Sequence, residues 1–152
     1  MRQLLLLAHL LGFVLWLGGG LAAMNLGIAM RSSAAGELAV MLRIMGRLYR
    51  ALILPGVLLT IGSGLLLTLQ LYGTAMSTGG YSTALMVMQG TGLLAGVLVL
   101  GVSLPTVARL GRLDPAGAQA PLFGALQRRA RIAGALNGIL ALVALVAGAL
   151  MR

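Results

Sequence analysis

The sequence contains no cysteine, only two acidic residues and a single histidine. Without cysteine the chain cannot form a disulfide, a cysteine-ligated zinc site, an iron–sulfur cluster or a thiol nucleophile. The two acids, Glu37 and Asp114, lie in different polar segments, and neither is placed to form a catalytic pair with His9. Charged residues make up 9% of the chain, against about a quarter in soluble proteins, while hydrophobic residues make up 60%. These absences exclude thiol and metal-cluster chemistry and indicate a membrane protein.

Four apolar stretches are long enough to cross a bilayer, which takes about 20 helical residues. They cover residues 4–29, 51–72, 83–108 and 130–151. Residues 34–49 place leucine and methionine at helical spacing, which predicts a short amphipathic helix at the inner membrane interface. The segment from Asp114 to Gln127 contains two prolines and is expected to be a connector. We therefore expect one all-α transmembrane domain, residues 1–152, built as an antiparallel four-helix bundle.

The charge pattern predicts the orientation of this bundle. All eleven basic residues are arginines, and most of them lie between the first two or the last two apolar stretches, whereas residues 73–82 carry no charge. Since positive residues stay on the cytoplasmic side, both termini and the middle connection are expected outside. This arrangement suits a multi-pass protein of a bacterial inner membrane with periplasmic termini. A nucleic-acid partner is not expected, because a phosphate-binding surface needs a solvated basic face with polar or aromatic partners.

Each predicted helix carries small and polar residues on one face when plotted at 100° per residue. In lipid, such faces mark the interior of a bundle, where neighbouring helices satisfy polar groups. Pro55 is expected to kink the second helix. The four faces comprise His9, Phe13, Trp16, Gly20, Ala23 and Gly27; Gly56, Thr60, Ser63, Gly64 and Gln70; Gln89, Gly92, Gly96 and Ser103; and Ala133, Asn137, Ala141, Ala144 and Gly148.

His9 is the residue on which a chemical function would depend. It lies five residues into the first helix and Gln89 six residues into the third, so both are expected roughly 7 to 9 Å below the outer boundary, where they could meet. In one interpretation, a neutral imidazole donates a hydrogen bond to Gln89 or to a backbone carbonyl and joins two helices. In the other, His9 is an axial ligand of haem iron.

The haem interpretation assigns further residues to a cofactor site. Phe13, Trp16 and Gly20 would line the slot beside His9, Gln89 would lie nearby, and Arg2 would pair with a propionate. One histidine cannot provide both axial ligands, so the sixth position would be open, filled by Met86, or filled by His9 of a second subunit. A homodimer or larger oligomer is expected in either interpretation.

Copper binding is a further alternative, because methionine and histidine are suitable ligands for Cu(I). The chain has nine methionines. Only Met86 and Met88 lie close together on an outward segment, and scattered methionines commonly serve as packing residues.

The first helix resembles that of a known family. Its sequence from His9 to Gly19, HLLGFVLWLGG, is similar to the opening helix of the bacterial CopD-like and HemJ-like four-helix membrane proteins. Residues 54–64, LPGVLLTIGSG, and the spacing of Arg131 and Asn137 resemble their second and fourth helices. The resemblance implies a haem b site that uses His9 or, on the CopD side, a role in copper handling. HemJ-like proteins carry a lysine where this chain has Gln89, so the uncharacterised CopD relatives are the nearer match.

The sequence thus predicts an integral membrane haem b-binding protein with a redox or haem-handling role. The alternatives are a non-catalytic membrane scaffold in which His9 is a structural hydrogen-bonding residue, and a copper uptake or delivery protein. The sequence assigns no enzymatic reaction and no redox partner. Its expected surroundings are the lipid bilayer and a second copy of the chain.

Overall fold

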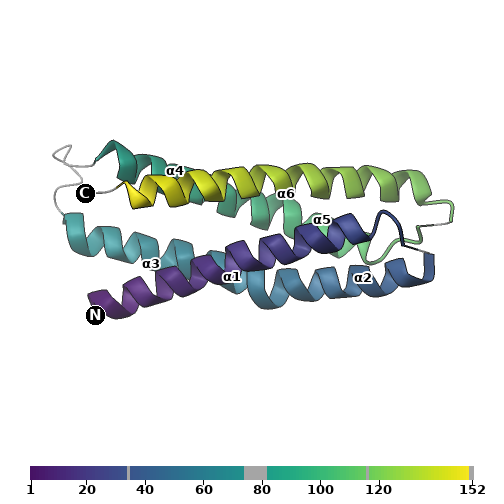
Figure 1. Ribbon diagram of the computed structural model, residues 1–152, viewed down its shortest axis with the longest axis horizontal. Coiled ribbons are helices and arrows are strands. Elements are labelled where there is room, and N and C mark those ends of the chain that lie inside the picture. The colour runs from purple at the N-terminus through teal and green to yellow at the C-terminus, as the bar shows by residue number, and fades with distance from the viewer. Residues whose placement is uncertain (34, 74–81, 116, 151–152) are drawn as a thin grey trace.

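The structure, a computed structural model, describes residues 1–33, 35–73, 82–115 and 117–150 (Figure 1). In these ranges the chain is helical almost throughout and contains no strand. Its four long helical stretches are Arg2–Ala29, Gly36–Tyr72, Thr83–Leu110 and Ala120–Ala149, each long and apolar enough to cross a membrane. This confirms the expected all-helical class with four candidate membrane spans.

The four stretches lie side by side along the long axis of the molecule (Figure 1). They are built from eight elements. The second and third stretches each contain a short π-helical turn, named η1 and η3. The elements are α1 (Arg2–Ala29), α2 (Ala35–Leu48), η1 (Tyr49–Ile53), α3 (Leu54–Tyr72), α4 (Thr83–Leu98), η3 (Val99–Ser103), α5 (Leu104–Leu110) and α6 (Ala120–Ala149).

The amphipathic segment expected at residues 34–49 corresponds to α2, but it is not a separate helix. It continues through η1 into α3, so that Gly36–Tyr72 is one helical stretch of 37 residues. The apolar face of α2 packs on protein, where Leu38, Met41 and Leu42 join a core cluster. The reason is that no helix-breaking residue separates α2 from η1. Residue 34, the first of the expected range, lies outside the described residues.

The fourth helix begins earlier than expected. It starts at Ala120 rather than near residue 130, so the predicted connector is shorter and Arg128 and Arg129 lie within α6. Pro121 sits in the first turn of α6. Proline fits there because its missing N–H would have no partner within the helix, so here it begins a helix instead of marking a loop. The expected last residue, 151, lies outside the described residues.

Both π-helical turns end two residues before a proline. Pro55 and Pro105 each occupy the first turn of the following helix. Proline lacks an N–H, and its ring collides with the carbonyl four residues before it. A wider turn absorbs this locally: the Leu54 N–H bonds to the Tyr49 carbonyl, and the Leu104 N–H to the Val99 carbonyl, five residues back in each case. The prolines therefore widen a turn without ending the helix.

The helices pack most extensively as two pairs, α1 with α3 and α4 with α6, while α1 and α6 share a much smaller contact. In the first pair, a Cβ atom built on Gly56 would lie 2.6 Å from the backbone nitrogen of Trp16, and one built on Gly12 would lie 2.7 Å from the backbone nitrogen of Thr60. The two backbones thus touch at positions where only glycine fits. Small residues allow this close packing between helices that have no hydrophobic drive to associate in lipid.

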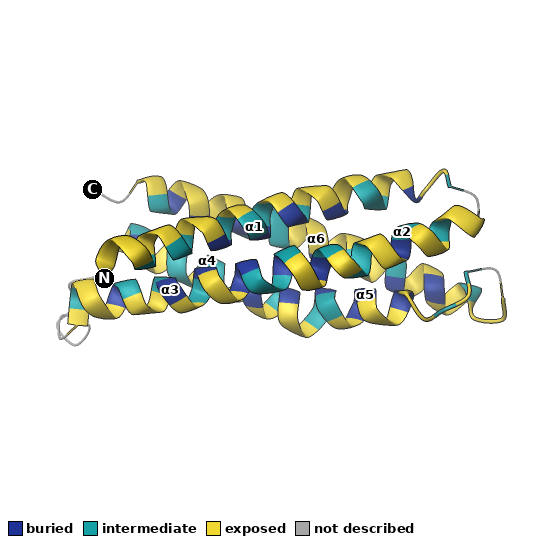
Figure 2. Ribbon diagram, turned by 90° about the horizontal axis from the view of Figure 1, so that it is seen from below, coloured by how far each residue is buried: buried dark blue, intermediate teal, exposed yellow. Residues whose placement is uncertain are grey.

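Buried residues follow the inward faces of the helices, and large apolar side chains cover much of the outer surface (Figure 2). One core cluster, around Trp16, Val57, Ala95 and Val99, occupies the middle of the bundle. A second joins α2 to the end of α1, the end of α5 and the start of α6; it comprises Met30, Leu42, Leu110, Phe123 and Leu126. We call this second group the α2-end cluster.

The close approach at Gly56 predicts a strong effect of a single methyl group. We expect Gly56→Ala to lower the free energy of unfolding by about 2 kcal/mol, because the new Cβ must push the α1 backbone away. Gly62→Ala on the same helix is the matched control, since a Cβ there meets nothing within 4 Å. Unfolding in mixed detergent, followed by circular dichroism, measures both. Equal stability of the two variants would contradict this packing.

Candidate functional site

His9 lies at the contact between α1 and α3. Its Nδ1 is 2.8 Å from the backbone oxygen of Thr60 and 3.4 Å from the Ser63 hydroxyl. The ring also packs on Gly64, where a built Cβ would lie 3.0 Å from the imidazole Cε1. Since a carbonyl oxygen can only accept, Nδ1 carries the proton and donates, which leaves the lone pair on Nε2. His9 therefore joins α1 to α3 and holds one defined tautomer.

Gln89 does not contact His9. Its side-chain nitrogen donates to the Thr68 hydroxyl at 2.5 Å, and that hydroxyl donates in turn to the Gly64 carbonyl at 2.9 Å. His9 bonds to α3 near Thr60 and Ser63. Gln89 bonds to it at Thr68, at least five residues farther along, so the two side chains do not lie at the same level of the helix. Thus α3 lies between them, and it connects α1 to α4 through His9, Thr68 and Gln89.

Trp16 and Asn137 form a polar link that the sequence analysis did not assign. Trp16 is 2% exposed. With the amide of Asn137 oriented to suit both neighbours, its oxygen accepts from the Trp16 indole nitrogen at 3.3 Å and its nitrogen donates to the Ala95 carbonyl at 3.1 Å. This link joins α1, α4 and α6. A shared depth on the inward faces of two predicted helices was the only signal that could have suggested it.

Beside this link lies an interhelical cavity of about 640 Å³. It extends between α1 and α6 toward α2, where these two helices share little contact, and both π-helical turns contribute to its wall. Glycine on α1 and α6 leaves room in the wall, and the rest is mostly apolar. Its lining includes Trp16, Gly20, Tyr49, Ser103, Asn137 and Gly138.

The cavity has polar groups at two levels. Arg31, Gln127 and Arg131 line it at the end near the α2-end cluster. Trp16 and Asn137 line it farther from that end, and Tyr49 and Ser103 add two hydroxyl groups to its lining. Several residues of its lining on α1, such as Leu21, Met24 and Ile28, are exposed, so the cavity opens sideways.

The residues predicted to form one cofactor site are divided by the structure. Trp16 and Gly20 line the interhelical cavity, whereas His9, Phe13, Gln89, Arg2 and Met86 do not. Phe13 is half-buried on α1, and Arg2 and Met86 are exposed. In the described part of the chain, no three His, Cys, Asp or Glu side chains gather as a metal site.

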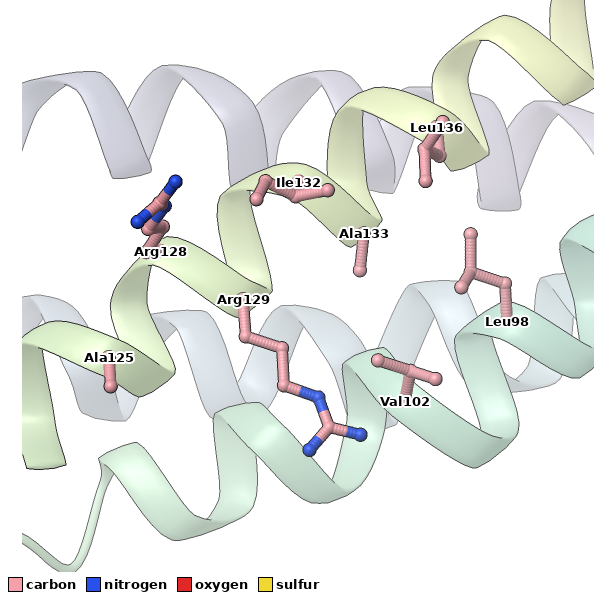
Figure 3. A pocket seen from close by; sticks show the side chains of 8 residues that line it. All are labelled: Leu98, Val102, Ala125, Arg128, Arg129, Ile132, Ala133 and Leu136. Atoms are coloured by element: carbon pink, nitrogen blue, oxygen red, sulfur yellow. The ribbon is translucent and has the colours of Figure 1, made fainter.

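A shallower groove of about 360 Å³ lies on the other side of α6 (Figure 3). Leu98 and Val102 form one wall and Ile132 and Leu136 the other, and Arg129 reaches from α6 toward the stretch that carries Val102 (Figure 3). The groove is open along its length and has few polar groups besides the arginines. It is an open surface groove and not an enclosed site.

Comparison with known proteins does not identify a relative: no protein-family model matches the sequence, and neither a curated protein nor a solved structure matches it significantly.

The position of His9 predicts a measurable structural role. We expect His9→Ala to lower the free energy of unfolding by about 1 kcal/mol, because it removes the hydrogen bond from the imidazole to the Thr60 carbonyl and with it the link between α1 and α3. Leu10→Ala is the control, since this neighbouring side chain is exposed. The same detergent unfolding measures both variants. A histidine substitution no more destabilising than that of Leu10 would contradict the role.

Proposed function

We propose that this protein is a multi-pass membrane protein whose interhelical cavity binds an anionic amphiphile, that is, a molecule with an apolar body and an acidic group at one end. In this proposal the four stretches cross the membrane as an antiparallel bundle with both termini outside. The α2 end, rich in arginine, then faces the cytoplasm.

One observation carries this proposal: two arginines from distant parts of the sequence line the same end of a largely apolar cavity. Arg31 follows α1 and Arg131 lies on α6, and Gln127 lines the cavity beside them. Neither of the two acids, Glu37 and Asp114, lines the cavity. Arginine binds carboxylate and phosphate groups through paired hydrogen bonds, and the apolar wall suits a hydrocarbon body.

The position of Trp16 makes this proposal testable. It is the only tryptophan and it lines the cavity, so quenching of its fluorescence reports occupancy. The probes are 9,10-dibromostearate, whose bromines quench indole, and its uncharged methyl ester. We expect the acid to quench the purified protein at about tenfold lower concentration than the ester, because only the acid bonds to the arginines.

Variants separate this contact from net charge. The double variant Arg31→Gln with Arg131→Gln is expected to bind the acid as weakly as the ester. The double variant Arg43→Gln with Arg47→Gln loses the same charge from exposed positions on α2 that do not line the cavity, and is expected to resemble the wild type. Equal quenching by acid and ester in the wild type, or equal losses in both double variants, would refute the proposal.

Haem binding by His9, which the family resemblance implies, is the second candidate. The hydrogen bond from Nδ1 to the Thr60 carbonyl favours it, because iron-binding histidines hold their other ring nitrogen in such a bond. Haem, if bound, would supply redox chemistry at His9. Arg2, near the start of the chain, would pair with one of its propionates. His9 does not line the interhelical cavity, so this site would be separate from it. Met86, or His9 of a second copy in a homodimer, would provide the sixth ligand.

The haem candidate predicts a coloured protein. After expression with ample haem, the purified chain should show a Soret band, and His9→Ala should abolish it while remaining folded. A colourless, folded wild type, or a band that persists in His9→Ala, would exclude His9 as the ligand. The scaffold role, in which His9 only joins α1 to α3, requires no more than the observed bond. Copper handling through His9 and Met86 stays a prediction that no contact in the described residues favours.

A further inference from the structure

Ser103 is an exception among the buried hydroxyl groups. It is 1% exposed and lines the interhelical cavity, yet its hydroxyl has no hydrogen-bond partner among the described residues. Leaving such a group without a partner costs about 1 to 3 kcal/mol. Thr60, Ser63, Thr68 and Thr106 are buried too, but each donates to the carbonyl four residues earlier.

The π-helical turn accounts for this exception. The carbonyl four residues before Ser103 is that of Val99, and in η3 it accepts from the Leu104 N–H, one residue farther along the chain than in a regular helix. Because the turn before Pro105 is widened, Ser103 has no local bond of the kind that satisfies the other hydroxyls. Its hydroxyl is left available on the cavity wall.

A second hydroxyl lies close to Ser103. Tyr49, the first residue of η1, also lines the cavity and is buried. Its hydroxyl is near enough to interact with Ser103, although the two do not adopt hydrogen-bond geometry. The two π-helical turns, from different helical stretches, thus bring two hydroxyl groups to one place in a cavity that is otherwise largely apolar.

From this arrangement we infer that Ser103 and Tyr49 form a polar subsite for an uncharged oxygen of the ligand, a carbonyl or hydroxyl group within its apolar body. The inference rests on the proposed function, since it concerns the same cavity. Ser103 lies seven residues from Leu110, and Tyr49 seven from Leu42, both members of the α2-end cluster beside Arg31. Seven residues of helix correspond to roughly 10 Å. The ligand therefore carries its uncharged oxygen roughly 10 Å from its acidic group.

Two fatty acids that differ by one oxygen test this subsite. Stearate and 10-oxostearate compete with 9,10-dibromostearate for the cavity, and recovery of Trp16 fluorescence measures each affinity. We expect the wild type to bind 10-oxostearate about fivefold more tightly than stearate, as one new hydrogen bond to a buried hydroxyl would give. Ser103→Ala should remove this preference, so that the variant binds the two acids equally.

Two comparisons make the outcome decisive. Thr106→Val removes a buried hydroxyl one turn away that does not line the cavity, so it should keep the fivefold preference. Ser103→Ala removes only an unpartnered group and should fold normally, which circular dichroism checks. Equal binding of the two acids by the wild type, or a preference that survives in Ser103→Ala, overturns the subsite. Either result leaves the proposed binding of an anionic amphiphile in the cavity unaffected. If neither acid displaces the brominated probe, both the subsite and the proposed function fail.

Discussion

A lipid bilayer offers no hydrogen-bonding partner to the backbone, so a helix within it must satisfy its own N–H and C=O groups. Pro55 and Pro105 each remove one donor from a long helical stretch. The chain responds in the same way twice, with a turn whose hydrogen bonds reach five residues back, η1 before one proline and η3 before the other. Both turns contribute residues to the interhelical cavity, and the released hydroxyl of Ser103 follows directly from one of them.

The polar contacts between helices divide the bundle into two parts. In the part of the bundle nearest the N-terminus, His9 and Gln89 both bond to α3. There, Gly12 and Gly56 also let α1 and α3 touch. Farther along, the Trp16–Asn137 link marks the level at which the space between α1 and α6 opens. From there to Arg31 the α2-end cluster holds the helices together around the cavity. Tight packing at one end therefore supports an open space at the other.

Much of the fold could be predicted from the sequence because lipid imposes a simple pattern. Hydropathy located the four stretches, and the 100° rotation identified Trp16, Ser63, Ser103 and Ala141 as inward-facing, all of which are buried. Gln70 was placed with them but is exposed, because a polar residue near a helix end need not face inward. The start of α6 was misjudged because Pro121 was interpreted as a loop residue, although proline is equally suited to a first helical turn.

The candidate site could not be assembled in the same way. Depth along a helix is a one-dimensional quantity, so the common depth expected for His9 and Gln89 could not establish contact. Contact depends on which helices are neighbours and on how each is rotated and shifted. Here α3 stands between α1 and α4. Likewise, neither the widened turns nor the unpartnered Ser103 hydroxyl has a signature that periodicity alone detects, since a Leu-Pro pair predicts a disturbed helix but not the form of the disturbance.

The cavity opens sideways, at exposed residues such as Leu21 and Met24. This opening determines in which phase, membrane or water, the ligand concentration should be expressed. If the four stretches cross the membrane as proposed, a molecule that reaches the cavity through this opening arrives from the surrounding lipid leaflet and not from water. Amphiphiles concentrate in that leaflet by the transfer of their own hydrocarbon, so the protein need not supply that part of the free energy. Selectivity is then left to the few polar contacts. The ligand concentration that this cavity responds to is then its mole fraction in the membrane. A modest affinity expressed as a mole fraction in the membrane corresponds to a low dissociation constant expressed as a concentration in water.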